Sequence, residues 1–231
     1  MNDLIEYNLV RSRRKTLAIH ITDGRVIIRA PIKMGQENIN RFIDLKKEWI
    51  SLRLASSVIK KKEREKFSLR FGDSILFLGK PYAIAPKEGG KANFDGECFF
   101  MPSDFGCEQI KQACIRIYRM LAKKHIEARV KEFSYMMAVD PKAIKITGAA
   151  ARWGSCSIKG SINFSWRLIM AEEDVVDYVI VHELAHLKIM NHSKKFWEAV
   201  ERVLPDYKQR QSKLKLLSKK LSSENWSLLN F

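Results

Sequence analysis

Three side chains with metal and proton chemistry lie within five residues, in the run His182-Glu183-Leu184-Ala185-His186. On a helix, residues four apart lie one turn above each other on the same face, so the two imidazoles can converge on one ion. Imidazole nitrogen is a common zinc ligand. Glu183 flanks such an ion without binding it, as a general base for zinc-bound water would. The pattern predicts a zinc-dependent hydrolytic site, and the alternative is a pair of hydrogen-bonded core histidines.

A third ligand is expected because catalytic zinc sites have three protein ligands and one open position. His192 falls six residues after His186, in a predicted corner between two helices from which its ring can turn back. This is the spacing of the H-E-x-x-H-x-x-G-x-x-H zinc proteases, although Ile189 replaces their glycine and their later methionine is missing. His192 is the predicted third ligand, with Glu198 or Glu201 as the competing one.

The composition indicates an ordinary globular chain of 231 residues, which suits one large domain or two small ones. No run approaches the roughly 20 apolar residues of a membrane span, and the N-terminus lacks a secretion signal. The four cysteines form no C-x-x-C pair and are expected to be reduced thiols. We therefore expect a cytoplasmic protein with no membrane partner.

A formal net charge of +16 is the strongest compositional signal. The basic residues gather at Arg11–Lys15, at Lys60–Lys66 and along Lys208–Lys220. A field of this sign favours polyanions, so contact with nucleic acid or a nucleotide is one interpretation. Solvated helix faces in a basic protein are the other, and the sequence favours neither.

Residues 1–103 are predicted to form a β-rich region with one basic helix. A hairpin is expected from 7–22 and 25–30, with Asp23-Gly24 as its turn. Apolar residues at helical spacing predict one helix from about Ile39 to Lys66. Further strands are predicted at 67–71, 74–78, 82–85 and 98–101.

Residues 104–231 are predicted to carry the site. The expected elements are a long helix over 108–137, strands at 144–147, 149–156 and 161–166, the histidine helix over 172–190, and a helix over 194–203. A strand just before the histidine helix can hold an extended peptide by backbone pairing. Arg152 and Trp153 on it are candidate substrate-binding residues, unless Trp153 is core and Arg152 pairs with an acid. A nucleophilic dyad of Cys156 with a histidine is disfavoured, since the nearby histidines are already assigned to the metal.

Several motifs together resemble the YgjP-like metallopeptidase family. They are Arg152-Trp153-Gly154-Ser155-Cys156-Ser157, Asn163-Phe164, Trp166-Arg167-Leu168, the run Asp177–Leu187, Asn191-His192-Ser193 with Phe196-Trp197, and Pro205-Asp206-Tyr207. The resemblance implies an α+β fold with a zincin-like catalytic core, its active-site helix packed on a small sheet. It also implies Zn²⁺ held by His182, His186 and His192, with Glu183 as catalytic acid and base. The family is distantly similar to SprT and WLM proteases.

The expected reaction is hydrolysis of a peptide or unfolded protein by zinc-bound water, with Glu183 as general base. Two alternatives stay open. A nucleoside triphosphate phosphohydrolase could use the same metal, although the chain lacks a Gly-rich phosphate loop. A basic nucleic-acid-binding module could hold a structural metal, although such sites usually have four protein ligands.

Overall fold

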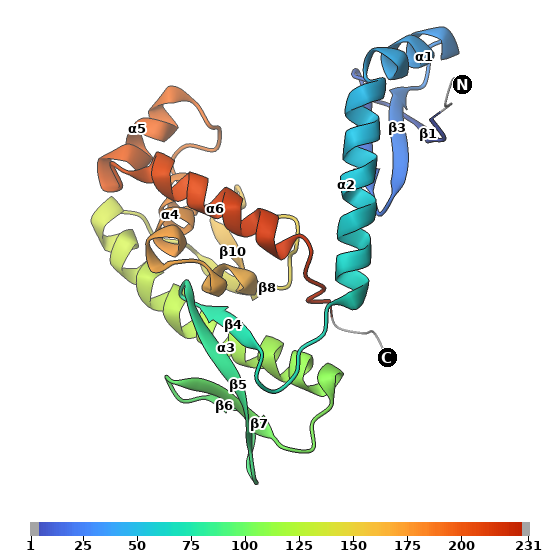
Figure 1. Ribbon diagram of the computed structural model, residues 1–231. Coiled ribbons are helices and arrows are strands. Elements are labelled where there is room, and N and C mark those ends of the chain that lie inside the picture. Colours follow the sequence, from blue (N-terminus) through green and yellow to red (C-terminus); the bar gives the residue numbers. More distant parts are fainter. Residues whose placement is uncertain (1–4, 228–231) are drawn as a thin grey trace. The chain divides into compact units, whose positions relative to one another are not determined.

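The computed structural model describes residues 5–227, and the chain divides into two compact units (Figure 1). The first unit extends to Phe67 and includes Leu221–Asn225; the second contains Ser68–Lys220 and the residues from Trp226. The boundary predicted after residue 103 therefore falls inside the second unit. There the Phe99 ring of one strand lies 5.4 Å from the Tyr118 ring of the long helix that follows, so the two sides of that position share one core.

The first unit contains a three-stranded sheet in the order β1-β3-β2. Its strands are β1 (Asn8–Ser12), β2 (Ala18–Thr22) and β3 (Arg25–Pro31). The predicted hairpin is confirmed, because β2 and β3 pair antiparallel around Asp23 and Gly24, which both have positive φ. The single strand expected over 7–22 is wrong: the chain breaks after Ser12, and β1 pairs parallel with β3.

Two helices cover this sheet, α1 (Gln36–Leu45) and α2 (Lys47–Lys66). The single helix predicted from Ile39 to Lys66 is broken at Lys46, where φ is −111° and the amide donates to Ile43 O, three residues earlier, as in a 3₁₀ turn. Apolar residues at alternate positions of β3 meet apolar residues of both helices. This core consists of Val26, Ile28, Ala30, Ile39, Ile43 and Ile50.

The second unit begins with a four-stranded sheet in the order β4-β5-β7-β6. Its strands are β4 (Ser74–Phe77), β5 (Lys80–Lys87), β6 (Asn93–Phe94) and β7 (Cys98–Pro102). The strand predicted at 67–71 is absent, because the Arg70 amide donates to the Asp73 carboxylate and Gly72 has φ of 89°, which makes a turn. The other strand predictions in this region are confirmed to within a few residues.

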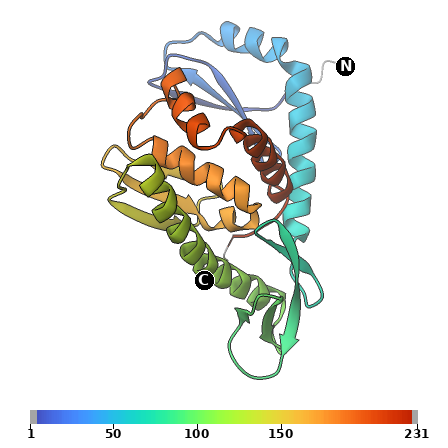
Figure 2. The same ribbon diagram turned by 90° about the vertical axis from the view of Figure 1, so that its left-hand side faces the viewer.

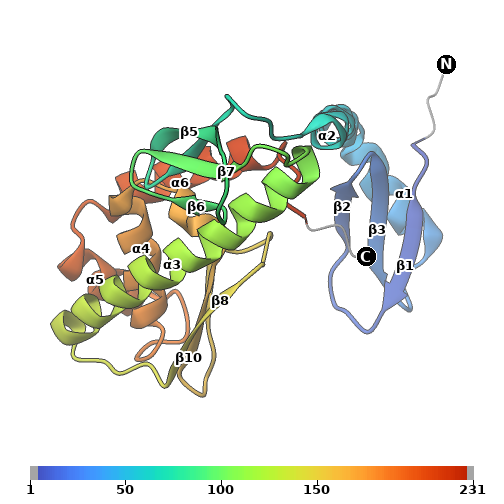
Figure 3. The same ribbon diagram turned by 90° about the horizontal axis from the view of Figure 1, so that it is seen from below.

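A 31-residue helix, α3 (Cys107–Met137), follows and confirms the predicted long helix. It lies beside the histidine helix and beside the strand β8 (Figure 3). The second sheet has the order β8-β10-β9, and its strands are β8 (Ala143–Thr147), β9 (Gly154–Cys156) and β10 (Ser161–Ser165). Because β9 pairs only with β10 within the described chain, it is an edge strand. A 3₁₀ turn, η1 (Trp166–Met170), leads into the histidine helix.

That helix, α4 (Glu173–Ala185), is almost wholly buried, and two helices follow it, α5 (Lys194–Val203) and α6 (Tyr207–Leu221). The prediction that α4 reaches residue 190 is wrong. The Leu187 and Lys188 amides donate to the carbonyls three residues earlier, which closes the helix in a tight turn after Ala185. The helix α5 has its predicted bounds, whereas α6 was not predicted.

Polar contacts fix α4 to its neighbours. Arg129 on α3 donates to both carboxylate oxygens of Asp177, at 2.7 and 2.6 Å. On the other side, Arg210 of α6 donates to Asp174 O at 3.0 Å, and Gln211 of α6 donates to the Tyr178 hydroxyl at 3.3 Å; α6 is the dark red helix of Figure 2. These contacts make α4 a rigid support for the side chains at its C-terminal end.

The predicted α+β class is confirmed, with small sheets, long helices and the histidine helix beside a three-stranded sheet. Among residues 5–227, none of the helices is both long enough and apolar enough to cross a membrane.

Candidate metal centre

The structure brings His182, His186 and His192 together, and we call them the histidine cluster. One potential ligand atom from each lies within 4.8 Å of the other two, and the Nε2 atoms of His182 and His192 are 3.1 Å apart. The first two residues are separated by one helical turn of α4. The third reaches them because the chain turns back between α4 and α5. Neither Glu198 nor Glu201 belongs to the cluster, and Glu198 instead lies 3.7 Å from Lys194 Nζ.

Electrostatics favour the neutral imidazole at two members of the cluster, His182 and His186. Burial, and then the neighbouring His186 and His192, lower the pKa of His182 to about 3. Burial also lowers the pKa of His186, although its hydrogen bond to Ile189 O acts in the opposite direction. That bond, 3.0 Å from His186 Nδ1, leaves Nε2 of the same ring for the cluster. Neutral rings with convergent nitrogens fit a divalent metal, since a metal ligand must be deprotonated.

The buried Nδ1 of His182 also bears on this fit. It has no hydrogen-bond partner among residues 5–227. Burying a polar atom without a hydrogen bond costs free energy. Binding of a metal by the opposite ring nitrogen would offset that cost. The donor set of three imidazoles suits zinc, although several first-row metals accept it.

Aromatic rings from α5 and α6 support the cluster. Phe196 is fully buried, and its ring centre lies 4.5 to 4.9 Å from all three imidazole centres. Trp197 stacks on His192 with ring centres 5.7 Å apart, and Tyr207 stacks on Trp197 at 5.3 Å. The Phe196-Trp197 pair contributes to the family resemblance in the sequence, but its packing on the imidazoles was not predicted. The spacing of Phe196 and Val200 indicates the buried face of α5, but no local pattern indicates that the histidines lie against it.

Glu183 lies beside the cluster and is 6% exposed. Burial raises the pKa of its carboxyl to about 7, which places the group between its two protonation states near neutral pH. The strand β9 approaches it closely: a Cβ atom built on Gly154 would lie 2.5 Å from Glu183 Oε1. Gly154 is thus required by space, because any larger residue would displace the carboxyl. This contact was not predicted, although Gly154 stands inside the noted Arg152–Ser157 motif.

The two predicted substrate-binding residues precede β9. Arg152 is exposed, and within residues 5–227 it pairs with no carboxylate. Trp153 is half-buried; its Nε1 donates to Ser218 Oγ on α6 at 3.0 Å, and its carbonyl accepts from the Ser165 amide. Trp153 is thus held between β10 and α6, while Arg152 stays available at the surface.

Cys156 lies near Glu183 at the other end of β9. Burial and the Glu183 carboxylate raise the pKa of its thiol, which disfavours the thiolate that a nucleophile needs. The cysteine–histidine dyad therefore gains no support. Like Cys98, Cys107 and Cys114, Cys156 is a free thiol.

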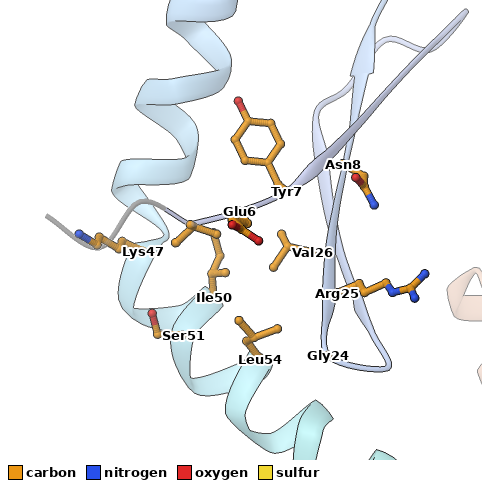
Figure 4. Close-up of a pocket in the computed structure, with 11 residues that line it drawn as sticks. Glu6, Tyr7, Asn8, Gly24, Arg25, Val26, Lys47, Ile50, Ser51 and Leu54 are labelled. Atoms are coloured by element: carbon orange, nitrogen blue, oxygen red, sulfur yellow. The ribbon is translucent and has the colours of Figure 1, made fainter.

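A separate hollow of about 1000 Å³ lies in the first unit between α2 and the strands (Figure 4). It is lined by side chains such as Tyr7, Val26, Ile50 and Leu54, and its charged lining residues are Glu6, Arg25 and Lys47. Its lining includes no histidine or cysteine.

Paired histidines on one helix, an adjacent buried glutamate and a third histidine in the next corner define the metallopeptidase class of site. A family model described as YgjP-like, metallopeptidase domain, matches residues 15–216. The chain belongs to the YgjP-like family and is a metallopeptidase.

Two solved structures match parts of this chain. The metallopeptidase zymogen abylysin of Pyrococcus abyssi is 25% identical, with a TM-score of 0.38 over 43% of this chain and 97% of that chain. The metallopeptidase zymogen jannalysin of Methanocaldococcus jannaschii is 24% identical, with a TM-score of 0.36 over 41% of this chain and 96% of that chain. A comparison with curated proteins found no match.

Proposed function

We propose that this chain is a zinc peptidase in which the histidine cluster holds the metal and Glu183 accepts and returns the proton. One observation supports the proposal most strongly. Ligand nitrogens of His182, of buried His186 and of exposed His192 converge within 4.8 Å, next to a buried carboxyl with a pKa of about 7. When bound, zinc would lower the pKa of a coordinated water and polarise the substrate carbonyl.

Glu183 carries the proton chemistry in this proposal. Its carboxylate takes a proton from the attacking water and delivers it to the leaving nitrogen as the peptide bond breaks. A pKa of about 7 suits both steps, since neither form is strongly disfavoured near neutral pH. The close contact with Gly154 restricts where the carboxyl can go, which preserves its position for both transfers.

The substrate would bind as an extended peptide along the free edge of β9. An edge strand presents unpaired backbone groups, and a peptide can pair with them irrespective of its sequence. Gly154 is the residue of β9 that lies against the Glu183 side chain, so a peptide paired with β9 would lie close to the proposed proton carrier. This mode of binding favours unfolded protein segments, because a folded substrate rarely offers an extended backbone.

Arg152 and Trp153 are the proposed substrate contacts beside that edge. The exposed guanidinium of Arg152 would bind a substrate carbonyl or carboxylate, and Trp153 would offer part of its half-buried ring. The Trp153–Ser218 hydrogen bond holds the ring in place before substrate arrives. Replacing Arg152 with alanine should accordingly act on KM more than on kcat.

The zinc content of purified His192→Ala protein tests the ligand assignment. We expect a large loss of zinc relative to the unchanged chain, because two imidazoles remain. Glu198→Ala is the matched control on the neighbouring helix, and it should keep its zinc. Loss of zinc in Glu198→Ala with retention in His192→Ala would reverse the assignment. Assaying unfolded protein beside nucleoside triphosphates, with and without chelator, would separate peptidase from phosphohydrolase activity.

A further inference from the structure

The basic runs of the sequence do not all remain available for a partner. In the first run, Arg11 donates to the carbonyls of Pro31, Ile32 and Met34, the last at 2.6 Å. In the C-terminal run, Lys213 contacts both Glu172 and Asp174, at 2.6 and 2.9 Å. These two runs therefore supply cations that hold the fold together. The run on α2 differs, because two of its cations, Lys60 and Arg64, line a hollow together with Arg53 from the preceding turns of the helix.

That hollow, of about 360 Å³, lies in the first unit between α2 and the turn that joins β2 to β3. From α2 it is lined by Trp49, Arg53, Ser56, Ser57, Lys60 and Arg64. These positions recur at intervals of three and four residues and form one face of the helix. The turn is fixed to that face by the hydrogen bond from the Gly24 amide to Ser57 Oγ, 3.0 Å, and by the ion pair of Asp23 with Arg64.

Two features of this face point to a ligand. Trp49 is 43% exposed, and the Arg53 guanidinium lies over its ring, 5.7 Å from the ring centre. Lys60 is half-buried in the hollow, yet it pairs with no carboxylate in the part of the chain that the structure describes. The one acid in the lining is Asp23, which Arg64 already neutralises. An exposed aromatic ring with Arg53 against it, and Lys60 further along the same face, complements an aromatic ligand that carries negative charge.

We propose that this face of α2 binds single-stranded nucleic acid, with a base stacked on Trp49 and phosphates on Arg53 and Lys60. Fifteen residues separate Trp49 from Arg64, about 22 Å along a helix. That distance is longer than one nucleotide and suits a segment of several nucleotides of single-stranded nucleic acid. An unpaired base offers a ring face for stacking, whereas a base inside a duplex does not.

The charge of the whole unit supports the same partner. Its residues, 1–67 and 221–225, contain 16 Lys and Arg against nine Asp and Glu. Such an excess steers polyanions towards the surface, and the hollow then provides the contacts that distinguish a nucleic acid from other polyanions. The proposal is independent of the peptidase chemistry, since no residue of the hollow belongs to the metal centre.

Binding of a fluorescent 15-nucleotide oligo(U) to the full chain tests this inference, by anisotropy at about 50 and 200 mM salt. We expect Trp49→Ala to weaken binding by about 10-fold, the loss of one stacked base. Lys60→Gln should reduce the slope of log affinity against log salt by about 0.7, the release expected from one single-strand phosphate.

Two variants on the same helix provide matched controls. Lys61→Gln removes the same charge from the next residue, which lies outside the hollow and 3.9 Å from Glu65. Leu52→Ala truncates an exposed apolar side chain that also lies outside it. Both should bind oligo(U) as the unchanged chain does. Hydrolysis of a peptide substrate should be the same in all four variants, so a failure of the peptidase proposal would be seen separately.

Three results would overturn the inference. The first is equal binding of inorganic polyphosphate, an acidic peptide or a duplex of the same charge. The second is an equal loss of affinity in Lys60→Gln and Lys61→Gln. The third is no binding of oligo(U) at the lower salt concentration.

Discussion

Among single residues, Gly154 has the most direct structural consequence for Glu183. Its backbone passes so close that an added Cβ would lie 2.5 to 2.8 Å from three atoms of the glutamate side chain. Gly154 has no positive φ, so alanine could adopt its backbone conformation without strain. The glycine is there for space alone, and the effect of replacing it can be predicted from one contact.

We expect Gly154→Ala to lower kcat by about 100-fold, since a carboxyl displaced by roughly 1 Å loses its alignment. Zinc content should stay at the level of the unchanged chain, because the three atoms nearest to an added Cβ all belong to Glu183 and none to a histidine. Steady-state hydrolysis of a peptide together with metal analysis checks both statements. Gly35→Ala is the control, since a Cβ there meets nothing within 4 Å. Equal activity in the two variants would contradict the proposed position of the proton carrier.

The histidine cluster shows what sequence can and cannot predict at this scale. The separation of four between His182 and His186 fixes their shared face once α4 exists, so their proximity follows from helix geometry. The position of His192 depends on the turn between α4 and α5. Its spacing of six residues from His186 predicted it as the third ligand, with Glu198 or Glu201 as the alternative. The rings of Phe196 and Trp197 against the imidazoles depend on how α5 docks, which short-range patterns do not encode.

Among the elements, α4 depends on its attachment to α3. The Arg129–Asp177 pair has two hydrogen bonds, and its side chains are 24% and 10% exposed. Removing one partner of such a pair leaves the other charge desolvated and alone. The same arginine also contacts Glu132, which is half exposed and therefore well solvated.

Asp177→Ala should lower the free energy of unfolding of the second unit by about 3 kcal/mol. Glu132→Ala removes the other partner of Arg129 and should change it by less than about 1 kcal/mol, as solvated ion pairs do. Urea unfolding followed by circular dichroism measures both. Equal losses in the two variants would mean that burial of Asp177 adds nothing to the attachment of α4.

Helix and strand positions were largely predictable, whereas helix ends were not. The apolar periodicity of α3 and the hairpin around Asp23-Gly24 are strong local signals, and both are confirmed. The end of α4 at Ala185 depends on backbone hydrogen bonds in the following turn. The helix α6 was missed because its sequence is mainly basic and polar, and Tyr207 is its single fully buried residue. Tertiary contacts to α4, rather than a hydrophobic face, account for much of its attachment.

At the scale of the whole molecule, the division into two units separates the two proposed activities. The metal centre and its supporting helices belong to the second unit, and the basic hollow belongs to the first. The composition gives the net charge, but it does not indicate which basic side chains hold the fold together and which remain available at the surface. That distribution depends on which cations find carbonyls or carboxylates, as Arg11 and Lys213 do.

Metal removal should therefore affect one unit only. A ligand that binds the folded state stabilises it by about 2.7 kcal/mol at a free concentration of 100 Kd. We expect calorimetry of the full chain to show two transitions, of which a chelator lowers one and leaves the other unchanged. Asp177→Ala should lower the same transition that the chelator lowers. A single transition that shifts as a whole would contradict the independence of the units.

The central claim is that the histidine cluster holds zinc while Glu183 carries the proton, and Glu183→Gln separates these roles. Glutamine has nearly the same shape but cannot accept the proton of water. Zinc stoichiometry and hydrolysis of an unfolded protein should be measured on the same preparation of this variant. We predict zinc bound as in the unchanged chain and hydrolysis reduced by at least about 100-fold. Full zinc content with undiminished hydrolysis would contradict the account.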